Sequence, residues 1–124
     1  MTYLLVFLGG GLGAALRHLV NRLAFAAFGP ALPVGTLFVN VAGGFFMGLL
    51  AALFLAKGGG DQALRLFLVT GLLGGFTTFS AFSLESALMW QRGEWAALAA
   101  YAIGSVVLSV GALFLGMATM RGLS

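Results

Sequence analysis

The third apolar segment of the chain contains, near its middle, the residues Gly74-Gly75-Phe76-Thr77-Thr78-Phe79-Ser80-Ala81-Phe82. Glycine and threonine are poor helix formers, because the glycine backbone is unusually free and the threonine side chain is branched at Cβ. A carbonyl left without a hydrogen bond at membrane depth has to be buried in protein or line a polar cavity. The stretch therefore predicts a transmembrane helix that is broken in its middle, and such helices are typical places for ion and substrate sites.

Composition places the chain in a membrane. Of its 124 residues, 61% are hydrophobic and only 7% are charged, and the mean hydropathy is +1.11. A soluble domain of this size cannot cover so much apolar surface with so few charges. The absence of cysteine excludes disulfides and thiolate metal sites. The six Lys and Arg residues are too few and too scattered for a nucleic-acid-binding face, so we expect an integral membrane protein.

Apolar runs of membrane-spanning length occur four times and occupy nearly the whole chain. We expect spans at about residues 3–28, 34–56, 66–90 and 96–120. Each has the ~20 residues that are needed to cross a hydrocarbon core of about 30 Å. Because the loops between them are short, we expect residues 1–124 to form a single four-helix transmembrane domain. The predicted fold class is all-α, with the third helix broken.

Pairs of glycines predict where these helices meet. A spacing of four residues puts two glycines on one helix face and lets the backbone of another helix approach closely. Three such pairs occur in the apolar segments: Gly9/Gly13, Gly44/Gly48 and Gly71/Gly75. We expect them at helix contacts.

The distribution of positive charge specifies the orientation in the membrane only weakly. Four crossings place Lys57, Arg65 and Arg121 on one side, and Arg22 and Arg92 on the other, with a further arginine deeper on that second side. The positive-inside rule needs a clear excess on one side. Two interpretations follow from this near-balance. Either the first helix sets a single orientation, or copies insert both ways and pair as an antiparallel two-fold dimer.

Polar side chains inside the spans are costly to place in hydrocarbon, so each needs a partner or water. Asn40, in the second span, is suited either to donate hydrogen bonds to an anion or to link two helices. Tyr101, Ser105 and Ser109 follow one another at four-residue intervals and share one face of the fourth helix. This stripe of hydroxyls is either a water-wetted track, which Ser80 and Ser83 beside the break would extend, or a set of separate helix contacts.

Two charges and two aromatic rings near the break also allow two interpretations each. Arg17 and Glu85 either pair across helices, which lowers the cost of burying both, or each reaches its own interface. At a vestibule Arg17 would attract anions. Phe79 and Phe82 share one helix face after the break, where packing or lipid contact is the ordinary role. The positive edge of an aromatic ring can also replace water around a small anion.

Taken together, these segments resemble the CrcB/Fluc family of fluoride channels. The resemblance covers essentially the full length, and the segment around the break is its most specific part. The matching residues are 10–18, 35–43 and 71–85, followed by Tyr101, Ser105 and Ser109 in the fourth span. One departure is Ala81, because a threonine is common at this position in the family.

The resemblance implies a passive fluoride channel, not an enzyme, in the bacterial plasma (inner) membrane, where it would protect the cytoplasm from fluoride. It implies a multi-pass, dual-topology antiparallel homodimer with two separate pathways. A structural Na⁺ would lie at the dimer centre on backbone carbonyls that match Gly74 and Thr77, with Arg17 at the vestibule and Glu85 in a structural role. The pathway residues implied are Asn40, Phe79, Phe82, Ser80, Tyr101, Ser105 and Ser109.

Two other classes of function are open to a protein of this size. One is a small dual-topology exporter of cationic drugs, but such exporters depend on a glutamate in the first span, and residues 3–28 contain no acidic residue. The other is a non-transporting assembly subunit, which would leave the break, the hydroxyl stripe and Asn40 without a shared purpose. The sequence therefore favours the channel.

Overall fold

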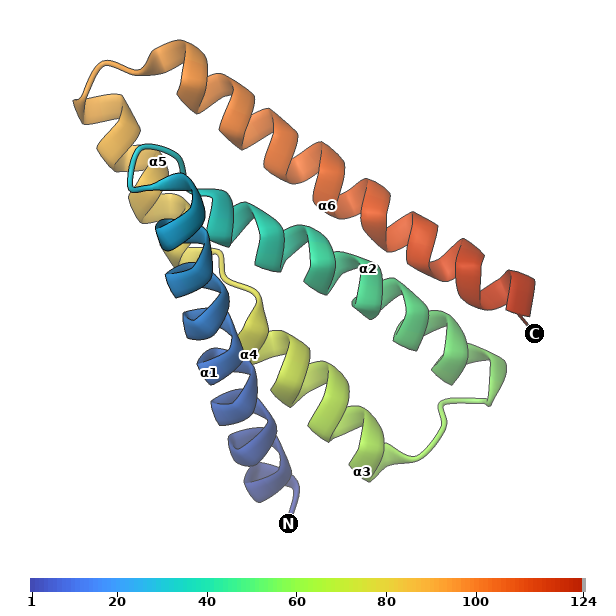
Figure 1. Ribbon diagram of the computed structural model, residues 1–124. Helices are drawn as coiled ribbons and strands as arrows, with labels where there is room; N and C mark the ends of the chain where they lie inside the picture. The colour runs from blue at the N-terminus through green and yellow to red at the C-terminus, as the bar shows by residue number, and fades with distance from the viewer. Residues whose placement is uncertain (124) are drawn as a thin grey trace.

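The computed structural model describes residues 1–123, and the regular structure among them is entirely helical (Figure 1). The helices are α1 (Thr2–Phe28), α2 (Val34–Ala56), α3 (Gln62–Arg65), the π-helix η1 (Leu66–Leu73), α4 (Gly74–Phe76), α5 (Ser80–Gln91) and α6 (Trp95–Leu123). In the described part of the chain, four segments are long and apolar enough to cross a membrane: Thr2–Phe28, Val34–Ala56, Gln62–Gln91 and Trp95–Leu123. The all-α class, the four spans and the break in the third are thus confirmed.

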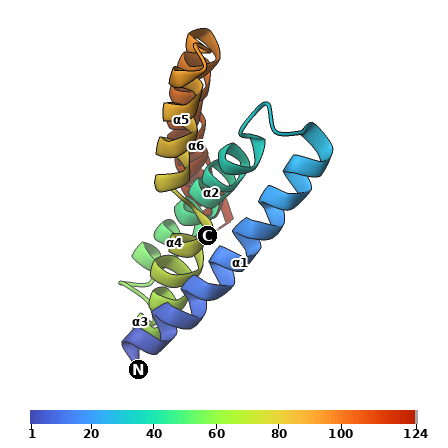
Figure 2. The ribbon, with the colours of Figure 1, turned by 90° about the vertical axis from the view of Figure 1, so that its left-hand side faces the viewer.

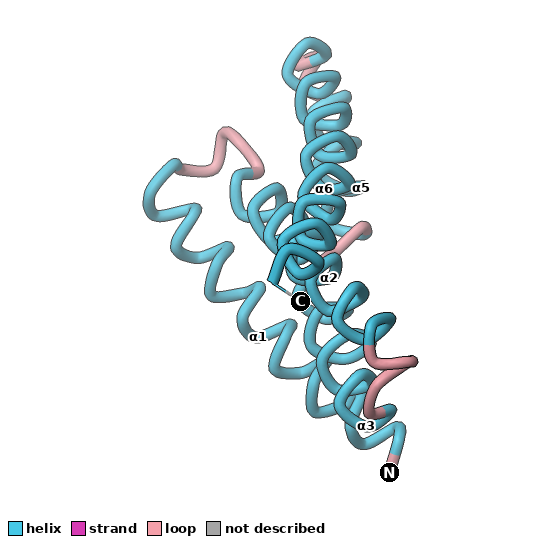
Figure 3. Tube along the Cα trace, turned by 90° about the vertical axis from the view of Figure 1, so that its right-hand side faces the viewer, coloured by secondary structure: helices cyan, strands magenta, loops and turns pink. Residues whose placement is uncertain are grey.

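The helices form two arms that meet at the break. Figures 2 and 3 show α5 beside α6 on one arm, while α1 lies along the other arm with α3 and α4. Large apolar side chains such as Phe7 and Phe114 are exposed on the outer faces. In water such surfaces would be unfavourable, whereas lipid accepts them because its chains are equally apolar. The chain is therefore a multi-pass membrane protein.

Glycines determine the closest helix contacts. On α2, a Cβ added at Gly44 or Gly48 would meet the carbonyl of Ser109 or Leu113 in α6, and one added at Gly116 of α6 would meet that of Phe45. The two helices run side by side along most of their length (Figure 1). This contact confirms the expectation for the Gly44/Gly48 pair.

The other two glycine pairs bring α1 against the first half of the third span. A Cβ at Gly9 would lie 2.5 Å from the carbonyl oxygen of Phe67, and one at Gly13 would meet the carbonyl of Leu72. On the opposing segment, a Cβ at Gly75 would meet the carbonyl of Gly10. Both pairs are therefore contact glycines, as predicted. They hold α1 against η1 and α4, directly before the break.

The hydrophobic pattern does not predict the π-helix η1, because its sequence is an apolar run like that of an ordinary transmembrane α-helix. Asp61 caps the short α3 that leads into it, where its Oδ1 accepts a hydrogen bond of 2.9 Å from the N–H of Ala63. The wider turns of η1 then extend to Leu73 and face the glycines of α1. π-Helix is rare, occurs mostly as single turns inside α-helices, and is frequent at functional sites. Here the π-helix is followed by the short α4 and then by the break.

We expect Gly48→Ala to destabilise the fold, because its new Cβ would collide with the carbonyl of Leu113, which the helix backbone holds in place. Overpacking of this kind costs about 1–3 kcal/mol. Gly111→Ala is the matched control, since nothing lies within 4 Å of a Cβ at that position and alanine favours helix. Thermal unfolding in detergent should show a lower midpoint for Gly48→Ala alone. Equal midpoints would contradict the close α2–α6 contact.

Candidate functional site

The third span is interrupted between α4 and α5. The N–H of Thr77 still donates to the carbonyl of Leu73 at 3.0 Å, so the first half-helix closes normally. Thr77 itself has φ −86° and ψ 162°, which is extended backbone, and helix resumes only at Ser80. The carbonyls of the last turn therefore lose the partners that a continuous helix would supply. Gly43 of α2 gives the break room, because a Cβ there would meet the methyl group of Thr77.

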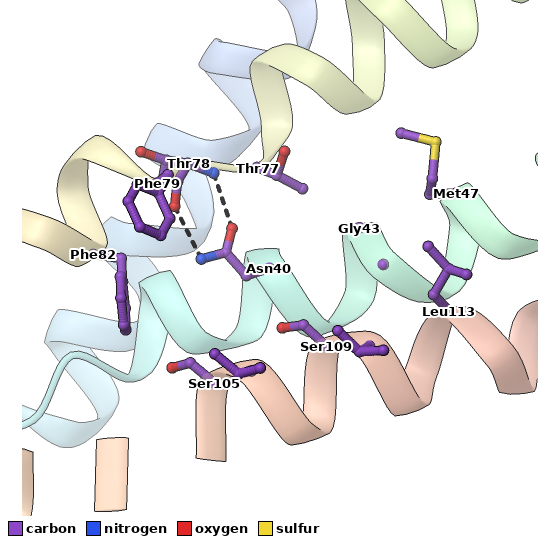
Figure 4. Close-up of a pocket in the computed structure, with 13 residues that line it drawn as sticks. Asn40, Gly43, Met47, Thr77, Thr78, Phe79, Phe82, Ser105, Ser109 and Leu113 are labelled. Carbon is purple, nitrogen blue, oxygen red and sulfur yellow. Dashed lines mark hydrogen bonds between the residues drawn. The ribbon is translucent and has the colours of Figure 1, made fainter. Parts of the chain in front are cut away.

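Asn40 of α2 holds the break in place with both ends of its side-chain amide. Its Nδ2 donates to the carbonyl of Thr78 at 3.0 Å, and its Oδ1 accepts from the N–H of Thr78 at 2.9 Å (Figure 4). The amide thus replaces the helical partners that Thr78 lacks. Of the two roles considered for Asn40, the link between segments is present in this structure. An amide has two N–H groups, and one of them stays available for a further acceptor.

Thr78 is a site residue that the sequence analysis missed. Its Oγ1 accepts a hydrogen bond of 3.1 Å from the N–H of Ala81 and lies 3.3 Å from the hydroxyl of Ser80. Phe79 is the residue directly before α5, and the side chain of Thr78 satisfies one of the free N–H groups at the start of the helix, as an N-cap side chain does. A threonine three residues before such an N–H is the usual signal for a cap. The capping role of Thr78 can be predicted only when the start of the second half-helix is known.

Arg17 and Glu85 have separate partners, so the alternative in which they pair with each other is wrong. The Nε of Arg17 donates to the carbonyl of Gly75 at 3.1 Å. A cation at this position balances the negative end of the first half-helix. Glu85 lies on the other side of the break and accepts a hydrogen bond of 3.2 Å from the hydroxyl of Tyr101. The two charges therefore fasten different halves of the third span.

An open groove with a volume of about 380 Å³ lies between α2, α6 and the break (Figure 4). Its floor is the seam of α2 and α6, and the broken segment forms one wall. The residues that line it are Asn40, Gly43, Gly44, Met47, Thr77, Thr78, Phe79, Phe82, Ser105, Val106, Ser109, Val110 and Leu113. The groove thus gathers most of the residues that the resemblance implied for the pathway. Ser80 and Tyr101 lie beside it, in contact with its lining.

Aromatic rings form a row at the edge of the groove. The ring centroids of Phe79 and Phe82 are 5.5 Å apart, and those of Phe82 and Tyr101 are 5.1 Å apart. The ring planes are tilted by 42° and 43°, so no two rings stack face to face. Phe79 is 77% exposed, whereas Phe82 is half-buried between its two neighbours. The row connects α5 to α6 and leaves Phe79 open on one side.

The hydroxyls of Ser105 and Ser109 are buried in the groove and make no hydrogen bond among the described residues. Burying a hydroxyl without a partner costs about 1–3 kcal/mol. Serine in a helix can usually avoid this cost by bonding to the carbonyl one turn earlier, but neither residue does so. Both hydroxyls are therefore able to donate a hydrogen bond to an acceptor in the groove. This arrangement favours the track over separate helix contacts.

The geometry joins a broken helix, a row of ring edges and unpartnered donors in one groove. Comparison with known families shows that the chain matches "CrcB-like protein, Camphor Resistance (CrcB)" over residues 4–117. The chain belongs to the CrcB family. The resemblance seen in the sequence is thereby confirmed.

Relatives of this CrcB chain carry a functional name. It is 53% identical over 124 residues to the fluoride-specific ion channel FluC of Rhodopseudomonas palustris strain BisB5, and it covers 100% of both chains. It is 55% identical over 124 residues to the fluoride-specific ion channel FluC 2 of Nitrobacter hamburgensis, again with 100% of both covered. The Paracoccus denitrificans channel FluC is 54% identical over 122 residues, or 98% of this chain and 96% of its own. The CrcB chain thus spans the length of its relatives.

Proposed function

We propose that the chain is a channel through which fluoride leaves the bacterial cell passively. The observation that carries this proposal is the pair of buried, unpartnered hydroxyls of Ser105 and Ser109 in the groove. The full-length relatives named fluoride-specific ion channels support the choice of fluoride as the anion. Passive conduction needs only weak binding sites in succession, and such sites are what the groove offers.

The chemistry of the groove suits a small anion with strong affinity for hydrogen bonds. Ser105, Ser109 and the second N–H of Asn40 can donate to it in turn. The rings of Phe79 and Phe82 add the positive edges of their quadrupoles beside this row of donors. An anion moving along the groove would exchange water for these groups step by step. The carboxylate of Glu85 is held by Tyr101 and stays outside the groove lining.

The working unit in this proposal is an antiparallel homodimer with two pathways. The groove is open, and the 77% exposure of Phe79 leaves a ring that a second copy would cover. Positive charge is nearly balanced between the two sides of the chain, which favours insertion both ways. Reporter fusions at the C-terminus should therefore show activity on both sides of the membrane. A reporter active on one side only would exclude the antiparallel pair.

A structural Na⁺ at the dimer centre fits the broken backbone. No hydrogen bond within residues 1–123 reaches the carbonyl of Gly74 or that of Thr77, because the N–H of Thr78 donates to Asn40 and that of Ala81 donates to the hydroxyl of Thr78. Oxygen ligands of this kind suit a hard cation. Gly74 is exposed, so its carbonyl is open to a partner copy. The carbonyls of Gly74 and Thr77 from each copy would hold the ion, which would supply positive charge between the two breaks.

The proposal is tested by fluoride efflux from proteoliposomes. Vesicles loaded with fluoride should release it at a rate that rises with the amount of reconstituted protein. A potassium ionophore keeps the membrane potential from opposing the flow, so a passive channel needs no other energy source. Release no faster than from protein-free vesicles, with the protein folded, would contradict the channel.

Ser109→Ala should separate conduction from stability. Removing an unpartnered buried hydroxyl is expected to raise the stability of the fold by about 1 kcal/mol, because the cost of burying it disappears. Fluoride efflux should fall by about tenfold, because the groove loses one donor. Thr119→Ala is the matched control, since its hydroxyl is exposed and already bonded to the carbonyl of Leu115. Unchanged efflux for Ser109→Ala would exclude this hydroxyl from the path.

A further inference from the structure

The groove has two chemically different ends. On α6, Ser105, Ser109 and Leu113 are spaced by four residues, so they lie on one face at steps of about 6 Å. The next place in the stripe after Ser109 is therefore occupied by an apolar side chain. Figure 4 shows Leu113 and Met47 together at the end of the groove away from Phe82. The row of donors ends where these two residues begin.

Close backbone contact places Met47 opposite Leu113. A Cβ at Gly44 would meet the carbonyl of Ser109, and one at Gly48 would meet that of Leu113. Met47 lies between these two glycines in sequence and lines the groove with Leu113. Val110, which follows Ser109 in sequence, is another apolar residue in the lining. We call Met47 and Leu113 the apolar lip.

We propose that the apolar lip is the rate-limiting, dry step of the anion path. This inference rests on the proposed function. It adds a position on the path at which the side chains of Met47 and Leu113 offer the ion no hydrogen-bond donor. Fluoride leaving Ser109 towards the C-terminal end of α6 has to pass the lip without a hydrogen bond from it. Hydrophobic constrictions slow ions in channels because they tend to lose their water, and an ion that enters must then give up its hydration shell. Methionine suits such a position because its unbranched thioether can move aside.

A hydroxyl introduced at the lip should speed conduction. Met47→Ser extends the row of donors by one turn, and we expect fluoride efflux to rise by about threefold or more. Leu115→Ser is the control, because Leu115 is 60% exposed on another face of α6 and does not line the groove. Efflux that is equal in the two variants, with wild-type protein conducting, would overturn the lip. Wild-type protein that conducts no fluoride would instead overturn the proposed function.

A second measurement covers the case in which Met47→Ser fails to fold. The natural chain contains no cysteine, so Met47→Cys carries a single thiol. Methyl methanethiosulfonate converts that thiol into a side chain with the shape of methionine, whereas the sulfonatoethyl reagent adds a negative charge. Efflux of the sulfonate adduct should be at least about tenfold below that of the methyl adduct. Equal efflux of the two adducts, or a thiol that does not react in the folded protein, would overturn the proposal.

Discussion

Asn40→Asp is expected to lower fluoride efflux by at least about a hundredfold, equivalent to about 2.7 kcal/mol in the barrier. The aspartate keeps an oxygen for the N–H of Thr78, but it has no donor for the carbonyl of Thr78, which Nδ2 now holds at 3.0 Å. Two negative oxygens would face each other at the break. The same substitution places a negative charge beside the path of an anion. Both effects act in the same direction.

The experiment for this position uses a second variant to separate the two effects. Asn40→Leu removes the hydrogen bonds to Thr78 without adding charge, so it should conduct less than wild type and more than Asn40→Asp. Fluoride-electrode traces from proteoliposomes give the rates, and size-exclusion elution with circular dichroism shows whether each variant is folded. Folded Asn40→Asp with efflux within about twofold of wild type would contradict the assigned role.

Phe82→Ile is the second substitution with a large expected effect, again a loss of about a hundredfold in fluoride efflux. Phe82 is the central ring of the row, with centroids 5.5 Å from Phe79 and 5.1 Å from Tyr101. Isoleucine keeps apolar volume but has no quadrupole, so the path loses a ring edge. The contacts that position the rings of Phe79 and Tyr101 are lost at the same time. An effect of packing alone would be much smaller.

Phe114→Ile provides the matched control for the ring. Phe114 is 65% exposed on the outer face of α6 and does not line the groove. The same chemical change should therefore leave the efflux rate close to that of wild type. If Phe82→Ile conducts like Phe114→Ile, the rings do not form part of the path.

Much of the fold follows from local sequence signals. The sequence predicts the second span at residues 34–56, and α2 occupies Val34–Ala56, because the prolines before it and the glycine loop after it mark both ends. The break follows from the glycine and threonine residues at its centre. The contact faces follow from the glycine spacing, because only a residue without Cβ lets the backbone of another helix approach so closely. Each of these signals lies within one short segment.

The features that the sequence did not reveal depend on two segments at once. An asparagine at position 40 is compatible with an anion site or a helix link, and only the packing of α2 against the break turns its amide to Thr78. Arg17 could have paired with Glu85, but the glycines of α1 bring it to the carbonyl of Gly75 instead. The π-helix Leu66–Leu73 likewise lies against the glycines of α1, and its own residues do not distinguish it from an ordinary apolar helix. The sequence of a single segment does not predict such contacts between distant parts of the chain.

The central claim is that the groove conducts fluoride. It is tested most directly by recording fluoride and chloride efflux from the same proteoliposomes, loaded with both anions, with ion-selective electrodes. We predict rapid release of fluoride, slow release of chloride, and loss of the fluoride signal in Asn40→Asp and Phe82→Ile. Fluoride release at the rate of protein-free vesicles from folded wild-type protein would contradict the account.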